Sequence, residues 1–387
     1  MRRVRAHLIS LVLKNLQRIL ASARMTSLET NCPNHHDLLF PSSLTPRASN
    51  LKPRTSYPKG PKARPHTMTP FEQNIIALVW DCDKTLISSY MQEPLFRHYN
   101  VDGGKFWREV NALREYYGRS GVHVNPDTSY LNHVLTYVKQ GLFKGLSNKL
   151  LHQFGRELVF YPGLPEFFGN IKGLVESDPK YKAFDIKLEH YVVSTGFAET
   201  IRGSAIAPFV DGIFGCEFIE TPALPGFDTD AAKTCAAPAE GEISQVACAL
   251  DNTSKTRYLF EINKGSNKYP DDIDVNSTIA RGDRRVPFEN MLYIADGPSD
   301  VPAFSILNYN GGSTFAVYPK GDVKAFRQVE KMRQDSRVQM FGEADYTEGS
   351  QSWLWLTEKV RSIADKIVES KQAAIKNSVS APPGHLS

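Results

Sequence analysis

Four short apolar runs, each followed directly by polar residues, limit the fold of this chain more than any other feature. The runs cover residues 75–80, 190–194, 291–295 and 314–318. Each is apolar at consecutive positions instead of alternate ones, a pattern typical of strands that are covered on both faces. Amphipathic helical patterns lie between the runs. Alternating strands and helices predict an α/β fold with a Rossmann-like, doubly wound parallel sheet.

A long helical stretch interrupts this alternation. Residues 93–160 contain amphipathic patterns for three or four helices and no strong strand, so we expect an inserted all-helical cap domain there. Residues 68–92 and 161–350 would then form the catalytic core. A fifth apolar run, at residues 212–219, is either another strand of this core or one half of a hairpin.

Two polar insertions and a C-terminal helix complete the expected body. Residues 222–242 are rich in Ala, Pro and Gly and predict a mobile loop, and residues 266–288 form a second polar insertion. The sequence leaves the role of both insertions open. Residues 351–387 begin with apolar residues at helical spacing, which predicts a helix packed on the core, and end in a polar tail.

The N-terminal segments differ in composition from the body. Residues 1–28 contain six Lys/Arg, no acid and one apolar helical face. This composition suits a mitochondrial presequence, and the alternative is an extension of the gene model. Residues 29–67 are rich in Pro, Ser, Asn and basic residues and predict a disordered linker. We therefore expect a cytoplasmic or mitochondrial protein, and the sequence leaves open whether residues 1–67 remain in the mature chain.

Charge, apolar length and cysteine spacing limit the partners and chemistry of the chain. The net charge of +4 divides into +10 for residues 1–67 and −6 for the remainder, and the body has no basic stripe. We therefore expect no nucleic-acid partner. No apolar stretch of about 20 residues is present, so we expect no stable membrane insertion. The five cysteines form no CxxC pair, which is typical of reduced thiols.

Polar residues that can bind a phosphoryl group and a metal follow three of the predicted strands. They are Asp81 and Asp83 after the first, Ser194 at the end of the second with Thr195 and Gly196 after it, and Asp296 and Asp300 after the third. The carboxyl ends of parallel strands meet at one edge of a sheet, where ligands bind. Carboxylates gathered at such an edge repel one another unless a hard cation lies between them. The donor set predicts Mg²⁺ as the cofactor.

Each of these residues has an expected role in phosphoryl transfer. Asp81 is a plausible nucleophile that forms an aspartyl-phosphate, and Asp83 can protonate the leaving oxygen and later deprotonate water. Ser194 would donate to a phosphoryl oxygen, beside Thr195 and Gly196. A lysine is needed to offset the negative charge. Lys255 is preferred over Lys264, because Lys255 begins a predicted helix and a helix N-terminus favours an anion.

These segments resemble the four motifs of the haloacid dehalogenase (HAD) superfamily. Those motifs are an apolar strand ending in DxDx(T/V), a strand ending in Thr or Ser, a lysine, and an acidic pair such as DGxxD. The corresponding segments read VWDCDKTL, YVVSTGF, SKT and YIADGPSD, and the similarity spans about residues 71–320. STGF is also similar to the second motif of the phosphoserine and phosphocholine phosphatase branch.

The resemblance implies a metal site built from Asp81, Asp83, Asp296 and Asp300. Asp83 would contribute its main chain, and Asp300 would position either the metal's waters or the lysine. It also implies that the helical cap closes over a small substrate. An acid at position 83 favours phosphoester hydrolysis over dehalogenation, because a halide leaves without a proton. The chain departs from the family at Lys84, where glycine is common.

We therefore expect a Mg²⁺-dependent phosphatase that hydrolyses a small phosphomonoester through an aspartyl-phosphate on Asp81. One alternative is a phosphotransferase that uses the same intermediate. Another is a non-enzymatic binding or scaffold protein with the HAD fold. The expected partner is a small phosphorylated metabolite. The sequence identifies neither that metabolite nor the oligomeric state.

Overall fold

The computed structural model describes residues 71–223, 225–227 and 241–379. All of them belong to one compact unit of the chain, residues 59–387. The predictions for residues 1–28 and 29–67, and for most of the loop at 222–242, lie outside the described residues. Among the described helices, none is both long and apolar enough to cross a membrane.

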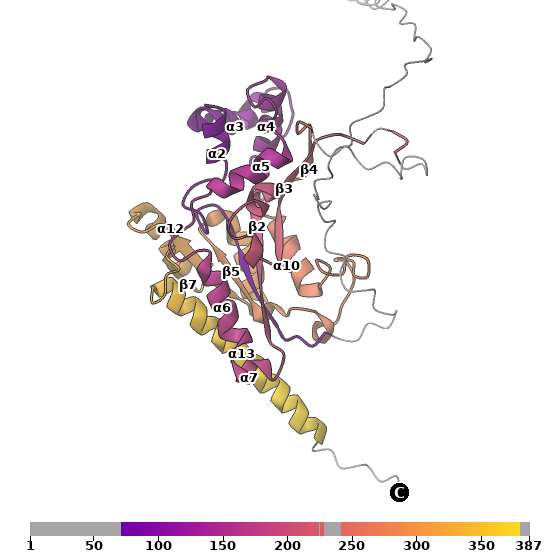
Figure 1. The fold of residues 1–387 in the computed structure, drawn as a ribbon, viewed down its shortest axis with the longest axis vertical. Coiled ribbons are helices and arrows are strands. Elements are labelled where there is room, and N and C mark those ends of the chain that lie inside the picture. Colours follow the sequence, from indigo (N-terminus) through magenta and orange to yellow (C-terminus); the bar gives the residue numbers. More distant parts are fainter. Residues whose placement is uncertain (1–70, 224, 228–240, 380–387) are drawn as a thin grey trace, which may run out of the picture. The chain divides into compact units, whose positions relative to one another are not determined.

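The core is a seven-stranded sheet (Figure 1), and five of its strands contain the five apolar runs. The strand order is β4-β3-β2-β1-β5-β6-β7, and every neighbouring pair is parallel except β3 and β4. The strands are β1 (Ile75–Trp80), β2 (Lys187–Phe197), β3 (Gly212–Ile219), β4 (Gln245–Cys248), β5 (Met291–Ala295), β6 (Ser313–Tyr318) and β7 (Met340–Glu343). The central strand β1 pairs with β2 on one side and with β5 on the other, so the expected doubly wound order is confirmed.

Two edge strands were not predicted. β4 and β7 each have four residues and are only partly buried, so neither produces a continuous apolar run. The run at 212–219 was expected to be either a further strand of the core or one half of a hairpin. It forms β3, which is parallel to β2 and antiparallel to β4, so both interpretations apply. β2 is longer than the predicted 190–194, and its pairing with β3 shifts between Val193 and Phe197.

Helices cover both faces of the sheet. α6 (Glu166–Glu176) and α13 (Gln351–Val379) contact each other on one face, and α10 (Lys255–Lys264) and α11 (Val301–Tyr309) contact each other on the opposite face. The shorter helices of the core are α7 (Pro179–Lys182), α8 (Ala198–Arg202) and α12 (Val323–Gln334). The predicted packing of the C-terminal helix on the core is confirmed by four buried residues of α13, namely Leu356, Val360, Ile363 and Ile367.

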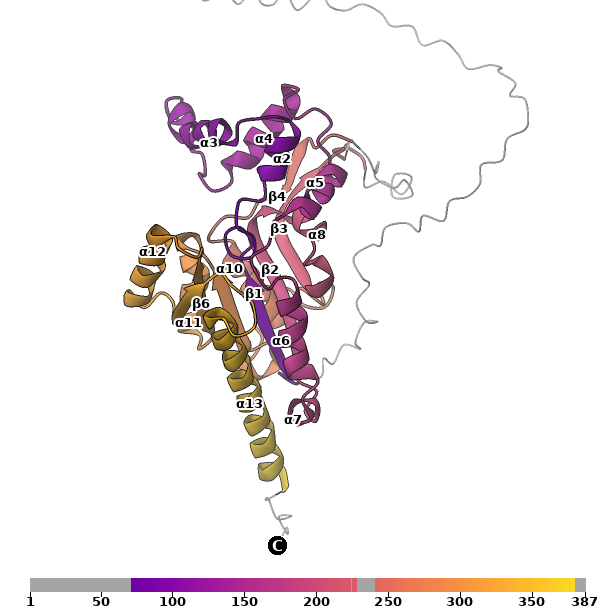
Figure 2. The same ribbon diagram turned by 60° about the vertical axis from the view of Figure 1, so that its left-hand side comes forward.

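A block of four helices follows the carboxyl end of β1. They are α2 (Glu93–His98), α3 (Gly103–Gly118), α4 (Ser129–Lys139) and α5 (Asn148–Phe154). Figures 1 and 2 show α2, α3 and α4 at one end of the sheet, with α7 at the other. The last of the four, α5, packs closely on α8 of the core: a Cβ on Gly203, just after α8, would meet the carbonyl oxygen of His152 in α5. Because α5 contacts the core so closely, the expected boundary between cap and core at residue 160 stays a prediction.

Candidate active site

Two neighbouring strands place acidic residues at the carboxyl edge of the sheet. Asp81 follows β1 and Asp296 follows β5, and the Asp81 backbone N–H donates to the Ile294 carbonyl at 2.9 Å. Carboxylate oxygens of Asp81, Asp296 and Asp300 all lie within 4.8 Å of one another. The fold thus brings together three of the predicted acids, at the point where β1 divides the two halves of the sheet.

Lys255 joins two of these acids. Its Nζ donates to Asp81 Oδ1 and to Asp300 Oδ1, both at 2.7 Å, and its side chain is 1% exposed. Burial alone would lower the pKa of Lys255, but Asp300 and Asp81 outweigh it and raise the pKa. Lys264, at the other end of α10, donates to the carbonyls of Val275 and Ser277. The structure therefore brings Lys255, and not Lys264, to the predicted nucleophile.

Asp300 is occupied by donors from the protein. It is fully buried, and its Oδ1 accepts from Tyr293 Oη at 2.6 Å in addition to Lys255, while its Oδ2 accepts from Ser299 Oγ at 2.8 Å. Asp300 thus holds the ammonium of Lys255 in place. Tyr293 was not predicted as a site residue, because it lies inside an apolar run. The one signal was that a buried tyrosine hydroxyl needs a hydrogen-bond partner.

Asp81 is held on its second oxygen by Thr85, another member of the first motif. Thr85 Oγ1 donates to Asp81 Oδ2 at 3.2 Å, and Tyr346 Oη donates to the Thr85 carbonyl at 2.7 Å. Burial raises the pKa of Asp81 to about 6, although the charge of Lys255 opposes the change. Lys255 on one oxygen and Thr85 on the other therefore fix the orientation of the Asp81 carboxylate.

Asp83 stands apart from the three clustered carboxylates. Its Oδ1 accepts the Met91 backbone N–H at 3.0 Å, and its side chain is not among those that meet within 4.8 Å. Burial, followed by the charge of Asp81, raises the pKa of Asp83 to about 8. Of the four residues predicted as metal ligands, Asp83 is the one whose carboxylate the structure does not bring to the cluster.

Negative charge at this edge is only partly offset. Lys255 supplies one positive charge against the carboxylates of Asp81, Asp296 and Asp300. Burial, followed by the charge of Asp81, raises the pKa of Asp296 to about 7. Close oxygen donors with uncompensated charge are the ligand set that Mg²⁺ prefers. These residues therefore fit the predicted ion.

The predicted phosphate-binding residues lie on the adjacent strand at the same edge. Ser194 is buried on β2, and its Oγ accepts the Gly196 N–H at 3.0 Å. The Thr195 carbonyl accepts from Tyr130 Oη of α4 at 2.5 Å, so the helical block contacts this edge directly. A Cβ at Gly196 would lie 2.4 Å from the end of the Met91 side chain, so a larger residue there would have to displace Met91.

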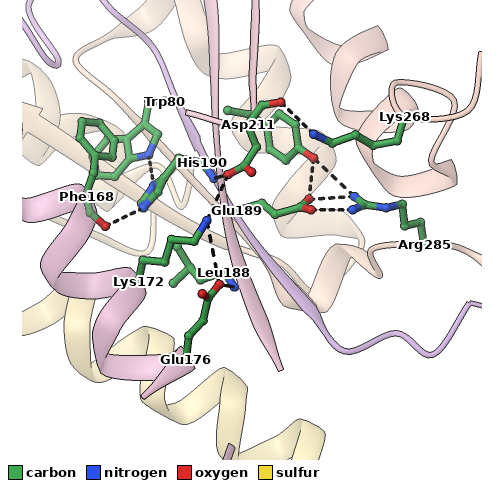
Figure 3. Close-up of polar contacts among 11 residues, drawn as sticks. Trp80, Phe168, Lys172, Glu176, Leu188, Glu189, His190, Asp211, Lys268 and Arg285 are labelled. Carbon is green, nitrogen blue, oxygen red and sulfur yellow. Dashed lines mark hydrogen bonds and ion pairs between the residues drawn. The ribbon is translucent and has the colours of Figure 1, made fainter. Parts of the chain in front are cut away.

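The insertion at 266–288 lies away from the acidic cluster. Arg285 donates two hydrogen bonds to Glu189, at 2.5 and 2.8 Å, and Lys268 donates to the Asp211 carbonyl at 2.8 Å (Figure 3). Glu189 pairs with Ala77 in the first half of β1, far along the strand from Asp81. The insertion therefore does not separate Lys255 from the acids that follow β5.

Comparisons with known proteins give one sequence relative. An uncharacterized protein of Borreliella burgdorferi is 39% identical over 292 residues, which cover 74% of this chain and 97% of that protein. No family model matches the chain.

The solved structures that this chain resembles include HAD-family hydrolases and phosphoserine phosphatases. A HAD family hydrolase from Salmonella enterica serovar Typhi is 13% identical with a TM-score of 0.40, covering 70% of this chain and 68% of that one. A probable phosphoserine phosphatase from Vibrio cholerae is 13% identical with a TM-score of 0.42, covering 77% and 68%. A phospho-aspartyl intermediate analogue of phosphoserine phosphatase is 13% identical with a TM-score of 0.39, covering 69% and 92%.

Proposed function

We propose that this chain, which belongs to the same family as the Borreliella burgdorferi protein, is a Mg²⁺-dependent phosphatase of the HAD type. Its substrates would be small phosphomonoesters. One observation carries the proposal. Asp81 lies at the end of the central strand, bonded to Lys255 at 2.7 Å and within 4.8 Å of the carboxylates of Asp296 and Asp300. The four segments that resemble the HAD motifs lie at this carboxyl edge of the sheet.

The acids that would hold Mg²⁺ are Asp81 and Asp296, with the main chain of Asp83. Asp300 supports them by holding Lys255, because its oxygens already accept from protein donors. When bound, the ion would screen the charge of the phosphoryl group and draw charge from its oxygens. Ser194 and the adjacent backbone of β2 would bind the phosphoryl oxygens from the other side.

The covalent step uses Asp81 as nucleophile. A carboxylate oxygen of Asp81 forms a bond to phosphorus while the bond from phosphorus to the leaving oxygen breaks, and Asp83 gives its proton to that oxygen. Water then attacks the aspartyl-phosphate and passes a proton to Asp83. Phosphate leaves, and both carboxyl groups return to their starting states. Lys255 and Thr85 orient Asp81 for this attack through their hydrogen bonds.

The test is hydrolysis of p-nitrophenyl phosphate by the full chain with and without Mg²⁺. We expect wild-type protein to turn over only with the metal, and Asp81→Asn to lose activity by at least about a thousandfold, because the amide cannot act as nucleophile. Asp271→Asn, which replaces an exposed acid far from the motifs in sequence, is the matched control and should retain wild-type activity. Addition of alcohol acceptors would reveal transfer to a molecule other than water.

Metal binding is measured separately by isothermal titration calorimetry with Mg²⁺. Heat of binding that disappears in Asp296→Asn supports the proposed ligand set. Wild-type protein that binds Mg²⁺ but hydrolyses no phosphomonoester would overturn the enzymatic proposal in favour of a binding or scaffold protein. Full activity of Asp81→Asn would overturn the aspartyl-phosphate.

A further inference from the structure

Lys84 occupies a backbone conformation that lysine rarely adopts. Its φ is +58°, in the left-handed region that favours glycine, and it lies between Asp83 and Thr85 of the first motif. A non-glycine residue in a sparsely populated backbone conformation at a candidate site supports a hypothesis that the residue has a function there. The side chain of Lys84 is therefore the feature to explain.

The Lys84 ammonium is held by an aromatic residue and not by an acid. Its Nζ donates to Tyr90 Oη at 2.7 Å and lies 4.2 Å from the centre of the Tyr90 ring. Within the described part of the chain, no carboxylate lies within 4.0 Å of this ammonium, as an ion pair requires. Lys84 is half-buried and Tyr90 is 42% exposed, so both remain accessible to a ligand.

Tyr90 begins a row of three aromatic side chains that ends beside Thr195. The ring centres of Tyr90 and Trp107 are 6.0 Å apart, and those of Trp107 and Tyr130 are 5.7 Å apart. Tyr130 ends the row, with its hydroxyl on the Thr195 carbonyl beside the phosphate-binding residues. The buried indole N–H of Trp107 has no acceptor among the described residues. A cation and a free N–H donor thus lie along this row.

We propose that Lys84 is a specificity-determining residue that selects phosphomonoesters whose leaving group carries a second anionic group, such as a carboxylate. This inference rests on the proposed phosphatase function. A carboxylate on the leaving group would form a charge-assisted hydrogen bond with Lys84, whereas an ammonium would be placed beside a like charge. The charges that face Lys84 at longer range are those of Asp296, a proposed metal ligand, and Asp83, the proposed general acid and base.

The test compares three compounds of similar size that differ in charge. Phosphoglycolate carries a carboxylate, ethyl phosphate is neutral beyond its phosphate, and phosphoethanolamine carries an ammonium. Each competes with p-nitrophenyl phosphate in the hydrolysis assay, which gives an inhibition constant even for a compound that is not hydrolysed. We expect phosphoglycolate to bind wild-type protein at least about tenfold more tightly than phosphoethanolamine, with ethyl phosphate between them.

Two variants of Lys84 should remove this preference. Lys84→Gln and Lys84→Gly should bring the three inhibition constants to within about threefold of one another. Glycine suits the left-handed conformation, so Lys84→Gly should also unfold at a temperature no lower than wild type, which separates selectivity from folding. Lys139→Gln, at an exposed lysine of α4, is the matched control and should keep the wild-type order.

Three results would overturn the inference. They are a wild-type preference for phosphoethanolamine, no inhibition by any of the three compounds, and an equal weakening of all three in the Lys84 variants. The last would show that Lys84 only offsets the charge of the nearby acids. Failure of wild-type protein to hydrolyse p-nitrophenyl phosphate would be a different result, because it refutes the phosphatase function on which the inference rests.

Discussion

His190 should make the protein lose stability as the pH falls below about 6.5, the ordinary pKa of the group. Its fully buried ring lies between two partners: Trp80 Nε1 donates to Nδ1 at 3.2 Å, and Nε2 lies 3.2 Å from the Phe168 carbonyl oxygen (Figure 3). An indole nitrogen only donates and a carbonyl only accepts, so the ring is neutral with its proton on Nε2. A second proton, on Nδ1, would face the Trp80 N–H directly.

The magnitude follows from the change in pKa on folding. Burial lowers the pKa of His190 from 6.5 to about 3, although the hydrogen bond to Phe168 opposes the change, and the charge of Lys172 lowers it slightly further. The unfolded chain therefore binds a proton that the native state excludes. The stabilisation is complete above the unfolded pKa and is lost as the pH falls towards the folded one. Each pH unit in that window lowers the free energy of unfolding by about 1.4 kcal/mol. Protonation of His190 in the unfolded chain should therefore lower it by about 2 kcal/mol between pH 7 and pH 5.

The assay is urea unfolding at pH 7 and pH 5, with His190→Asn as the variant. Asparagine does not titrate, so the variant should lose about 2 kcal/mol less than wild type between the two pH values. It will be less stable at pH 7, because the Phe168 carbonyl loses its donor. His123→Asn, at an exposed histidine before α4, is the control and should follow wild type. Parallel pH profiles of wild type and His190→Asn would refute the reasoning.

Two further predictions concern buried contacts of the core. Arg285→Met should lower the free energy of unfolding by about 3–5 kcal/mol, because it leaves the carboxylate of Glu189 buried without its ion-pair partner. Adding Glu189→Leu should restore part of the loss. A loss below about 1 kcal/mol in urea unfolding would mean that water already reaches this pair. Gly203→Ala should cost about 3 kcal/mol or more, because its Cβ would lie 1.7 Å from the His152 carbonyl oxygen. Gly118→Ala, where the space is open, should leave the thermal midpoint almost unchanged, and equal midpoints for the two alanine variants would contradict the clash.

The sequence determined the central part of the fold because buried parallel strands have a local signature. β1 and β5 have the predicted bounds, since each is apolar at every position. Asp81 and Asp296 follow these strands directly, so their convergence at one edge could be inferred once the sheet was taken as parallel. β4 was missed, because a short, partly exposed edge strand lacks such a run.

Only the tertiary structure decided which distant side chains meet at the acids. Lys255 reaches Asp81 across 174 residues of sequence, and neither its helix nor its charge distinguished it conclusively from Lys264. Tyr293 was hidden inside an apolar strand, and its role appears only where its hydroxyl meets Asp300. The pattern of apolar residues records how each segment is buried. It does not record which partners burial brings within hydrogen-bonding distance, because those contacts depend on the packing of segments far apart along the chain.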